Sequence, residues 1–317
     1  MARPQPSTIA SAHGPAVVVV GSSNTDMILR VAHVPRPGET LLGGEFSTAA
    51  GGKGANQAVA AARAGGRVAF VARIGLDSLG DEAVAGFRRE GIGVSHVVRD
   101  PSRPSGVALI FVGGDGENSI GVAGGANQRL SPADVNAARR SIAKARVLLV
   151  QLETPLRTVE AAARLASRAG VPVILNPAPA QHLPDRLLRN VSVLTPNETE
   201  ASLLTGIRVK DVASAARAAR ALKARGVGTV IVTLGAKGAL VAGADGERWV
   251  RGFKVKAVDT TAAGDVFSGA LAVRLAEGRP LADAVRFAHA AAAISVTRAG
   301  AQPSIPARRE ILARLRK

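Results

Sequence analysis

Short apolar runs that alternate with helical patterns constrain the fold of this chain more than any other feature. Five runs read as buried strands, and two longer Ala-rich stretches between them, 156–169 and 212–225, have helical spacing. Strands that are joined through helices pair in parallel, with the helices packed on both faces of the sheet. The pattern therefore predicts an α/β fold. The five runs are Val17–Gly21, Val147–Leu152, Val171–Leu175, Val191–Leu194 and Thr229–Thr233.

Polar side chains follow several of these strands directly. The carboxyl ends of parallel strands meet at one edge of the sheet, where α/β proteins bind their ligands. Six polar residues in such positions predict a ligand-binding crevice at this edge. They are Glu153, Asn176, Asn197, Glu200, Thr233 and Asp265.

The stretch from residue 253 to 277 is expected to bind an anion. Phe253–Val258 reads as a strand, residues 259–264 as a turn of small residues, and a helical pattern runs from Asp265 to about Glu277. The free N–H groups and the dipole of that helix could hold a phosphate. Asp265 could take the proton of a hydroxyl group that attacks a phosphoryl group. The alternative is that Asp265 only caps the helix.

Two further stretches are candidates for ligand binding. Asn24 and Asp26 point the same way if the chain stays extended after the first strand, so they could bind neighbouring hydroxyls of a sugar; the alternative is an Asx-turn. The glycine-rich turn 49–56 precedes an expected helix, Gln57–Ala64, and offers Lys53 and Asn56 as donors. This turn lacks the spacing of a P-loop, and it could also be purely structural.

Residues 105–122 depart from the α/β pattern. Gly106–Val112 and Asn118–Val122 read as a hairpin with a glycine-rich turn, and a short strand is expected within 40–47. Together these strands predict a small separate sheet that could exclude water as a lid during phosphoryl transfer. The glycine turn Gly235–Gly238 lies at the predicted binding edge and would suit phosphates or a nucleotide, although such turns are common.

Composition limits the other classes of function. The formal net charge of +17 invites nucleic-acid binding, but the arginines are scattered along helical patterns and few aromatic residues are available to stack on bases. The chain has no Cys, its His spacing does not suggest zinc, and residues 1–15 have no apolar core of a signal peptide or anchor. We expect a soluble cytoplasmic protein with a disordered tail at 1–15, one domain at 16–317, and no nucleic-acid or membrane partner.

The ordered set of motifs resembles the ribokinase family of carbohydrate and nucleoside kinases across about residues 16–312. The resemblance implies a three-layer α/β/α fold with a small β lid, formed by about 24–50 and 105–123, that also makes a homodimer. It implies transfer of the γ-phosphoryl group of ATP to the 5-hydroxyl of D-ribose. The motifs are Gly21–Asp26, Gly51–Gln57, Gln151–Glu153, Asn176–Pro179, Thr195–Glu200, Val232–Gly235, Asp259–Asp265 and Gly300–Ser304.

The same resemblance implies a role for individual residues. Asp265 would be the base, and the amides of Ala262, Ala263 and Gly264 would form the anion hole. Ribose would be bound by Asn24, Asp26, Gly52, Lys53, Gly54, Ala55, Asn56 and Glu153. The nucleotide would be bound by Asn197, Thr233, Leu234, Gly235, Ala236, Lys237, Gly238, Gly264 and His289. By its position alone, His289 on an Ala-rich face is more typical of a half-buried structural histidine.

Metal ions complete the implied site. Glu200 would act on Mg²⁺ through water, and a K⁺ site would be formed by Asp259, Thr261, Ser295, Arg298, Gly300 and Ser304. From position alone, Asp259 could instead cap its turn through backbone N–H groups. A kinase for deoxyribose or a nucleoside is the nearest alternative function. A nucleotide-binding regulator without catalysis is a more distant one.

Overall fold

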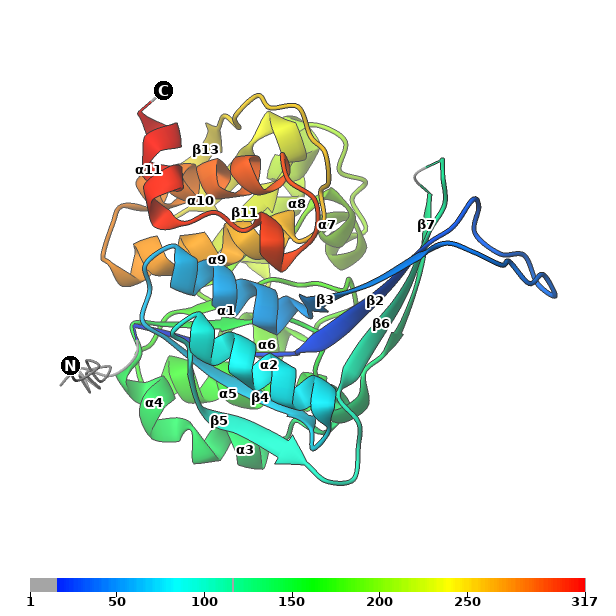
Figure 1. Cartoon of the computed structure of the whole chain (residues 1–317). Coiled ribbons are helices and arrows are strands. Elements are labelled where there is room, and N and C mark those ends of the chain that lie inside the picture. Colours follow the sequence, from blue (N-terminus) through cyan, green and yellow to red (C-terminus); the bar gives the residue numbers. More distant parts are fainter. Residues whose placement is uncertain (1–15, 116, 317) are drawn as a thin grey trace, which may run out of the picture.

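A nine-stranded sheet forms the centre of the computed structural model, which describes residues 16–115 and 117–316 (Figure 1). Its strand order is β13-β12-β11-β10-β9-β8-β1-β4-β5. The pairs from β11 to β5 are parallel, whereas β12 and β13 are antiparallel to their neighbours. The predicted α/β class is confirmed. The tail at 1–15 lies outside the described residues.

The strands of this sheet are short and apolar because both faces are covered. In β1, Val17 and Val19 belong to the hydrophobic core on one face, and Val18 and Val20 to the core on the other. All four side chains are fully buried. The strands are β1 (Val17–Val20), β4 (Val68–Gly75), β5 (Gly93–Asp100), β8 (Val147–Val150), β9 (Val173–Leu175), β10 (Val193–Leu194), β11 (Thr229–Thr233), β12 (Ala239–Gly243) and β13 (Gly246–Val250).

Helices cover both faces of the sheet, as Figure 1 shows. One layer contains α1 (Lys53–Arg63), α2 (Ser78–Arg89), α9 (Ala263–Ala276), α10 (Leu281–Ser295) and α11 (Arg308–Leu315). The other contains α3 (Pro132–Ala137), α4 (Arg139–Lys144), α5 (Leu156–Arg168), α6 (Asp185–Leu188), α7 (Glu198–Thr205) and α8 (Val212–Ala224). No helix in the described part of the chain is long and apolar enough to cross a membrane.

A second, four-stranded sheet projects from the main body (Figure 1). Its order is β3 (Glu45–Gly51), β2 (Asn24–Arg30), β6 (Gly106–Val112) and β7 (Asn118–Ala123). The hairpin predicted at 106–122 is confirmed as β6 and β7. The strand that we expected within 40–47 lies later, and the polar stretch after β1 continues as β2, which pairs in parallel with β6. This sheet is called the small sheet below.

Several sequence predictions of local structure are wrong. Phe253–Val258 forms no strand, because the antiparallel hairpin β12–β13 occupies that end of the large sheet. Val258 is 66% exposed, and its N–H donates to the carbonyl of Val296. Helix α1 begins at Lys53 rather than Gln57, because the glycine-rich turn ends directly in the helix. Strands β5, β12 and β13 and helices α3, α4, α6, α7 and α11 were not predicted.

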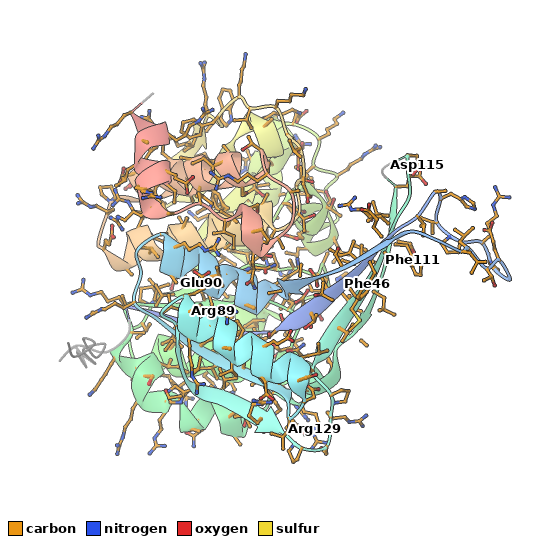
Figure 2. All side chains as sticks on the ribbon, in the orientation of Figure 1. Phe46, Arg89, Glu90, Phe111, Asp115 and Arg129 are labelled. Carbon is orange, nitrogen blue, oxygen red and sulfur yellow. The ribbon has the colours of Figure 1, made fainter. Side chains whose placement is uncertain are left out.

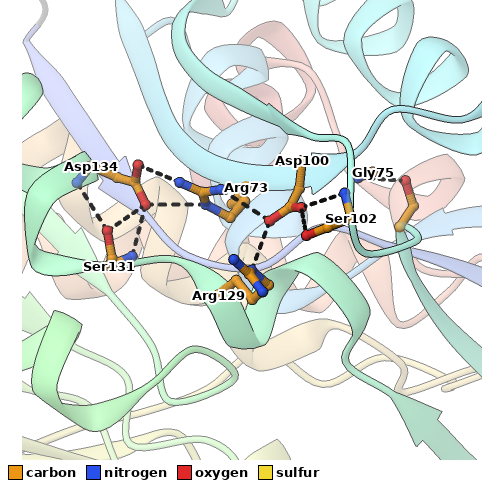
Figure 3. A network of polar contacts seen from close by, with 8 residues as sticks. Arg73, Gly75, Asp100, Ser102, Arg129, Ser131 and Asp134 are labelled. Atoms are coloured by element: carbon orange, nitrogen blue, oxygen red, sulfur yellow. Dashed lines mark hydrogen bonds and ion pairs between the residues drawn. The ribbon is translucent and has the colours of Figure 1, made fainter.

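A cluster of charged side chains connects β4 and β5 to the segment that follows the small sheet (Figure 3). Arg73 on β4 binds Asp134 at 2.8 Å and Asp100 at 3.0 Å. Arg129, in the 3₁₀ turn η1 (Gly125–Arg129), binds Asp100 at 3.1 Å. The Ser102 N–H and hydroxyl, with Arg73, hold the pKa of buried Asp100 well below its usual value. The negative charge of Asp100 is thereby balanced by the positive charges of Arg73 and Arg129.

Candidate active site

The N-terminus of α9 leaves its amides free for a ligand. Helices α7 and α8 begin with Asn197 and Asp211, whose side chains accept hydrogen bonds from the first turn. Helix α9 begins with Ala262, which has no side-chain cap and a φ of 60°. It is the only non-glycine residue with positive φ in the described ranges, and backbone strain of this kind concentrates at functional sites. The Ala263 N–H donates to the Thr260 carbonyl at 3.2 Å, whereas the next two N–H groups, of Gly264 and Asp265, remain available to an anion.

Asp265 is held by two amide side chains and not by its own helix. Gln57 Nε2 donates to Asp265 Oδ1 at 2.9 Å, and Asn56 Nδ2 donates to Oδ2 at 3.1 Å. The side chain is buried, and burial raises the pKa of Asp265, while Lys53, Gln57 and Asn56 act in the opposite direction. These contacts argue against a capping role, and a buried carboxylate with a raised pKa fits a general base.

A cavity of about 200 Å³ opens beside Asp265 at the carboxyl ends of the parallel strands. The strand-end residues predicted to meet at one edge line this cavity, except Glu153. The edge predicted from the sequence is therefore the edge that carries the cavity. The cavity is lined by Lys53, Asn176, Ala178, Thr195, Asn197, Glu200, Thr233, Thr260, Ala262, Ala263, Gly264, Asp265, Phe267 and Ser268.

Glu153 belongs to a polar group next to this cavity. Its Oε2 accepts from the Lys53 N–H at 2.9 Å and from the Ser22 hydroxyl at 2.5 Å. Burial, together with the charges of Glu153 and Asp265, raises the pKa of Asp26 to about 6. Asp26, Glu153 and Asp265 therefore lie close enough to influence one another, as expected for one sugar pocket.

The glycine-rich turn packs directly against β2. Gly52 has a φ of 86°, and a Cβ atom there would lie 2.6 Å from the Asn24 backbone nitrogen. Asn24 itself is buried, and its Oδ1 accepts from Asn127 Nδ2 at 2.8 Å. Gly54 and Ala55 continue into α1 and are buried. The predicted ribose contacts thus come together from β2, this turn and α1.

Glu200 has an environment that suits a nearby cation. Its carboxylate accepts from the backbone N–H and from Nδ2 of Asn197, both at 3.0 Å. Burial raises the pKa of Glu200 to about 7, although Asn197 and Lys53 favour the charged form. A hydrated Mg²⁺ ion held nearby would offset this cost of burial. No three His, Cys, Asp or Glu side chains of the described residues form a ready-made metal site.

The predicted nucleotide contacts divide into two groups. Asn197 and Thr233 form a parallel β-bridge and line the cavity, as does Gly264. The other predicted contacts do not line the cavity. They are His289 and the turn formed by Leu234, Gly235, Ala236, Lys237 and Gly238. A Cβ atom at Gly238 would lie 2.0 Å from the Val250 carbonyl oxygen. The close packing of this position against β13 therefore requires a glycine. Gly235, Ala236 and Lys237 are exposed.

His289 lies behind the cavity rather than in it. Its ring packs edge-on against Phe267, with ring centroids 5.0 Å apart. Burial lowers the pKa of His289 to about 4, so the ring is neutral at pH 7. Its Nε2 is buried and has no hydrogen-bond partner in the described part of the chain. The ring is therefore buried rather than half-buried, and its contact with the cavity is through Phe267.

The proposed K⁺ ligands lie on two neighbouring loops. Asp259 Oδ1 accepts from the Thr261 N–H and Oδ2 from the Gly300 N–H, both at 2.8 Å. Asp259 therefore makes the backbone contacts of the capping alternative, and these contacts also join the two loops. The hydroxyls of Ser295 and Ser304 donate to backbone carbonyls, and Arg298 pairs with Glu310.

Sequence analysis did not assign a role to Gln57 or to Gln151, which lie behind Asp265. Gln57 is fully buried and contacts Asp265, Asn176 and Gln151. It follows Asn56 in the glycine-rich motif, but nothing in the sequence indicated that it faces the carboxylate. A buried polar residue within an otherwise apolar helix was the available signal.

Known proteins resemble this chain over most of its length. The model of the pfkB family carbohydrate kinases matches residues 15–308. Ribokinase from Haemophilus influenzae is 49% identical over 93% of this chain and 97% of its own. Deoxyribokinase from Salmonella typhimurium is 39% identical over 92% of this chain and 95% of its own. The structure of Arabidopsis thaliana ribokinase complexed with ribose and ATP aligns with a TM-score of 0.89 at 35% identity, covering 96% of this chain and 99% of that one. The chain therefore belongs to the pfkB family of carbohydrate kinases.

Proposed function

We propose that this protein phosphorylates D-ribose at its 5-hydroxyl with ATP, giving D-ribose 5-phosphate and ADP. The observation that carries the proposal is the buried Asp265 carboxylate, held by Asn56 and Gln57 beside the uncapped N-terminus of α9. The resemblance to ribokinases over most of the chain supports ribose as the sugar.

Each part of the site has a task in this reaction. Asp265 takes the proton of the sugar hydroxyl as its oxygen attacks the γ-phosphorus of ATP and the bond to ADP breaks. The amides at the start of α9 stabilise the negative charge that develops on the transferred group. Lys53 keeps its positive charge there, because Asp265, Glu153 and Glu200 outweigh the burial that lowers its pKa. Mg²⁺ near Glu200 would neutralise phosphate charge when bound.

Discrimination between ribose and deoxyribose tests the choice of sugar. Hydroxyl-binding groups lose their partner when a sugar lacks the hydroxyl, so we expect kcat/KM for 2-deoxyribose to be at least about 10-fold lower than for ribose. A coupled assay of ADP release over a panel of pentoses, deoxyribose and nucleosides measures this difference. Equal values for the two sugars, or a preference for deoxyribose, would make the chain a deoxyribokinase instead.

A monovalent cation is proposed as an activator at Asp259. The carboxylate joins the turn before α9 to the loop that contains Gly300, so an ion bound there would fix the direction of the α9 amides. We expect higher activity in K⁺ than in Na⁺ or tetramethylammonium at equal ionic strength. Asp259→Asn should reduce that difference. Equal rates of the unmodified protein in the three salts would leave Asp259 with only its backbone contacts.

The small sheet is proposed as both a lid and a homodimer interface, in residues 24–50 and 105–123. Ile120 and Val122 lie on the face of Asp26, and Phe46 and Leu109 on the other face. All four are more than half exposed, which is unusual for apolar side chains in one small sheet. Figure 2 shows Phe46 on this sheet. A molar mass in solution near that of one chain would contradict the dimer.

We also propose a cytoplasmic location, for which the absence of Cys is the support.

A further inference from the structure

Gln57 uses every hydrogen-bonding group of its side chain inside the protein. Its Nε2 donates to Asp265 Oδ1 at 2.9 Å and to Asn176 Oδ1 at 3.0 Å. Its Oε1 accepts from Gln151 Nε2 at 2.6 Å. The residue is fully buried, so water cannot replace any of these partners. A neutral amide with three partners is held much more firmly than a surface glutamine.

The contacts also fix which way the amide faces. A carboxylate oxygen can only accept, and a reversed Gln57 amide would turn its own oxygen toward Asp265. The reversal would also bring its NH₂ group against the NH₂ of Gln151. Both changes replace an attraction by a repulsion in a buried place, where the cost is high. Gln57 therefore presents a donor to Asp265 when the carboxylate is ionised.

We propose that Gln57 is a positioning residue that decides which oxygen of Asp265 receives the substrate proton. Each oxygen accepts one amide hydrogen bond, Oδ1 from the fully buried Gln57 at 2.9 Å and Oδ2 from Asn56 at 3.1 Å, and in this proposal the sugar hydroxyl approaches on the Oδ2 side. Oδ2 faces Asn56, which is an expected ribose contact and whose own Oδ1 is buried without a partner among the described residues. The inference rests on the proposed function, in which Asp265 is the base.

The position of Gln57 explains how this control is transmitted. Its backbone belongs to α1, whereas its three partners lie on α9 and directly after β8 and β9. The carboxylate is thus placed relative to the strand ends that line the cavity, not only by its own helix. A shift of the carboxylate of about 1 Å is enough to cost a large part of the rate of a transfer reaction.

Gln57→Glu tests this role, because it keeps the shape and replaces the donor by a second carboxyl group. Two carboxyl groups at hydrogen-bond distance share a proton, so the pKa of the pair rises and the base is protonated at higher pH. Activity is lost as pH falls through that pKa. We therefore expect the acidic limb of the kcat profile to move to higher pH. At pH 7 we expect kcat to fall about 10-fold or more, with a much smaller change in KM for ribose.

Gln57→Met is the second variant, since Met has similar length but cannot donate. It should also lower kcat and move the acidic limb upward, because Asp265 loses a bond that favours its charged form. Gln181→Glu is the matched control. Gln181 donates to the Leu152 carbonyl and not to Asp265, so the same change there should leave the profile unchanged.

The outcomes separate this inference from the proposed function. If either folded variant of Gln57 keeps the pH profile and kcat of the unmodified protein, Gln57 does not position the base. A uniform loss of activity with an unchanged pH profile would also overturn the proposal, since a structural role alone predicts that result. The proposed function is tested separately, by the panel of sugars and by Asp265→Asn, and neither of these results depends on Gln57.

Discussion

Asp265→Asn is expected to lower kcat by at least about 10²-fold while the fold and ATP binding are kept. The amide has nearly the shape of the carboxylate but cannot take a proton from the sugar hydroxyl. The change also removes a buried charge that accepts from Asn56 and Gln57. Single-turnover phosphorylation, with nucleotide affinity measured in parallel, separates loss of the base from loss of binding.

Asp81→Asn is the control for a purely helical role. Asp81 lies in the first turn of α2, as Asp265 does in α9, but it is exposed and binds Arg99 at 2.7 Å. Its replacement should leave kcat unchanged. If the two variants were equally active, Asp265 would be no more than a first-turn acid, and the assignment of the base would be wrong.

The pH dependence of kcat has an expected direction. Burial raises the pKa of Asp265 above its usual value, and the base works only when it is ionised. Activity should therefore decline as pH falls, and the decline should begin at a higher pH than for an exposed aspartate. A kcat profile that is flat down to pH 4 would show that no buried carboxylate has to be ionised.

The sequence predicted the binding edge better than it predicted the local structure around it. The rule that parallel strands end at one edge needs only the order of strands and helices, so Asn176, Asn197 and Thr233 could be placed together. It could not place Phe253–Val258, because the apolar pattern of that run is the same whether it joins a sheet or crosses the surface. The hairpin β12–β13, which takes the end of the sheet, was not predicted.

Sequence periodicity could not predict the hydrogen bonds that position Asp265. Gln57 and Gln151 are 94 residues apart, and their hydrogen bond depends on how α1 packs beside β8. Local spacing describes which face of one element is buried, but not which side chain of another element it meets. The αL conformation of Ala262 was missed for a related reason, since alanine gives no signal for positive φ.

Gly269→Ala is expected to destabilise the protein by about 1–3 kcal/mol, although alanine is the better helix former. Gly269 lies one turn after Asp265 in α9, where the helix crosses α1. A Cβ atom there would lie 2.6 Å from the carbonyl oxygen of Gln57 and 2.9 Å from the backbone nitrogen of Ala61. Backbone atoms cannot move aside singly, so the two helices must separate. That movement would also displace Gln57 from Asp265 and lower kcat.

Gly86→Ala is the matched control for this prediction, because it makes the same change within a helix. A Cβ atom at Gly86 in α2 would meet only the end of the flexible Arg89 side chain, at 3.7 Å. There the gain in helix propensity should remain, and we expect stabilisation of about 0.5–1 kcal/mol. Thermal unfolding of the two variants, followed by circular dichroism, should therefore shift in opposite directions. If Gly269→Ala unfolds at the same temperature as Gly86→Ala, the close approach of α1 and α9 does not require a glycine, and the placement of Asp265 does not depend on it.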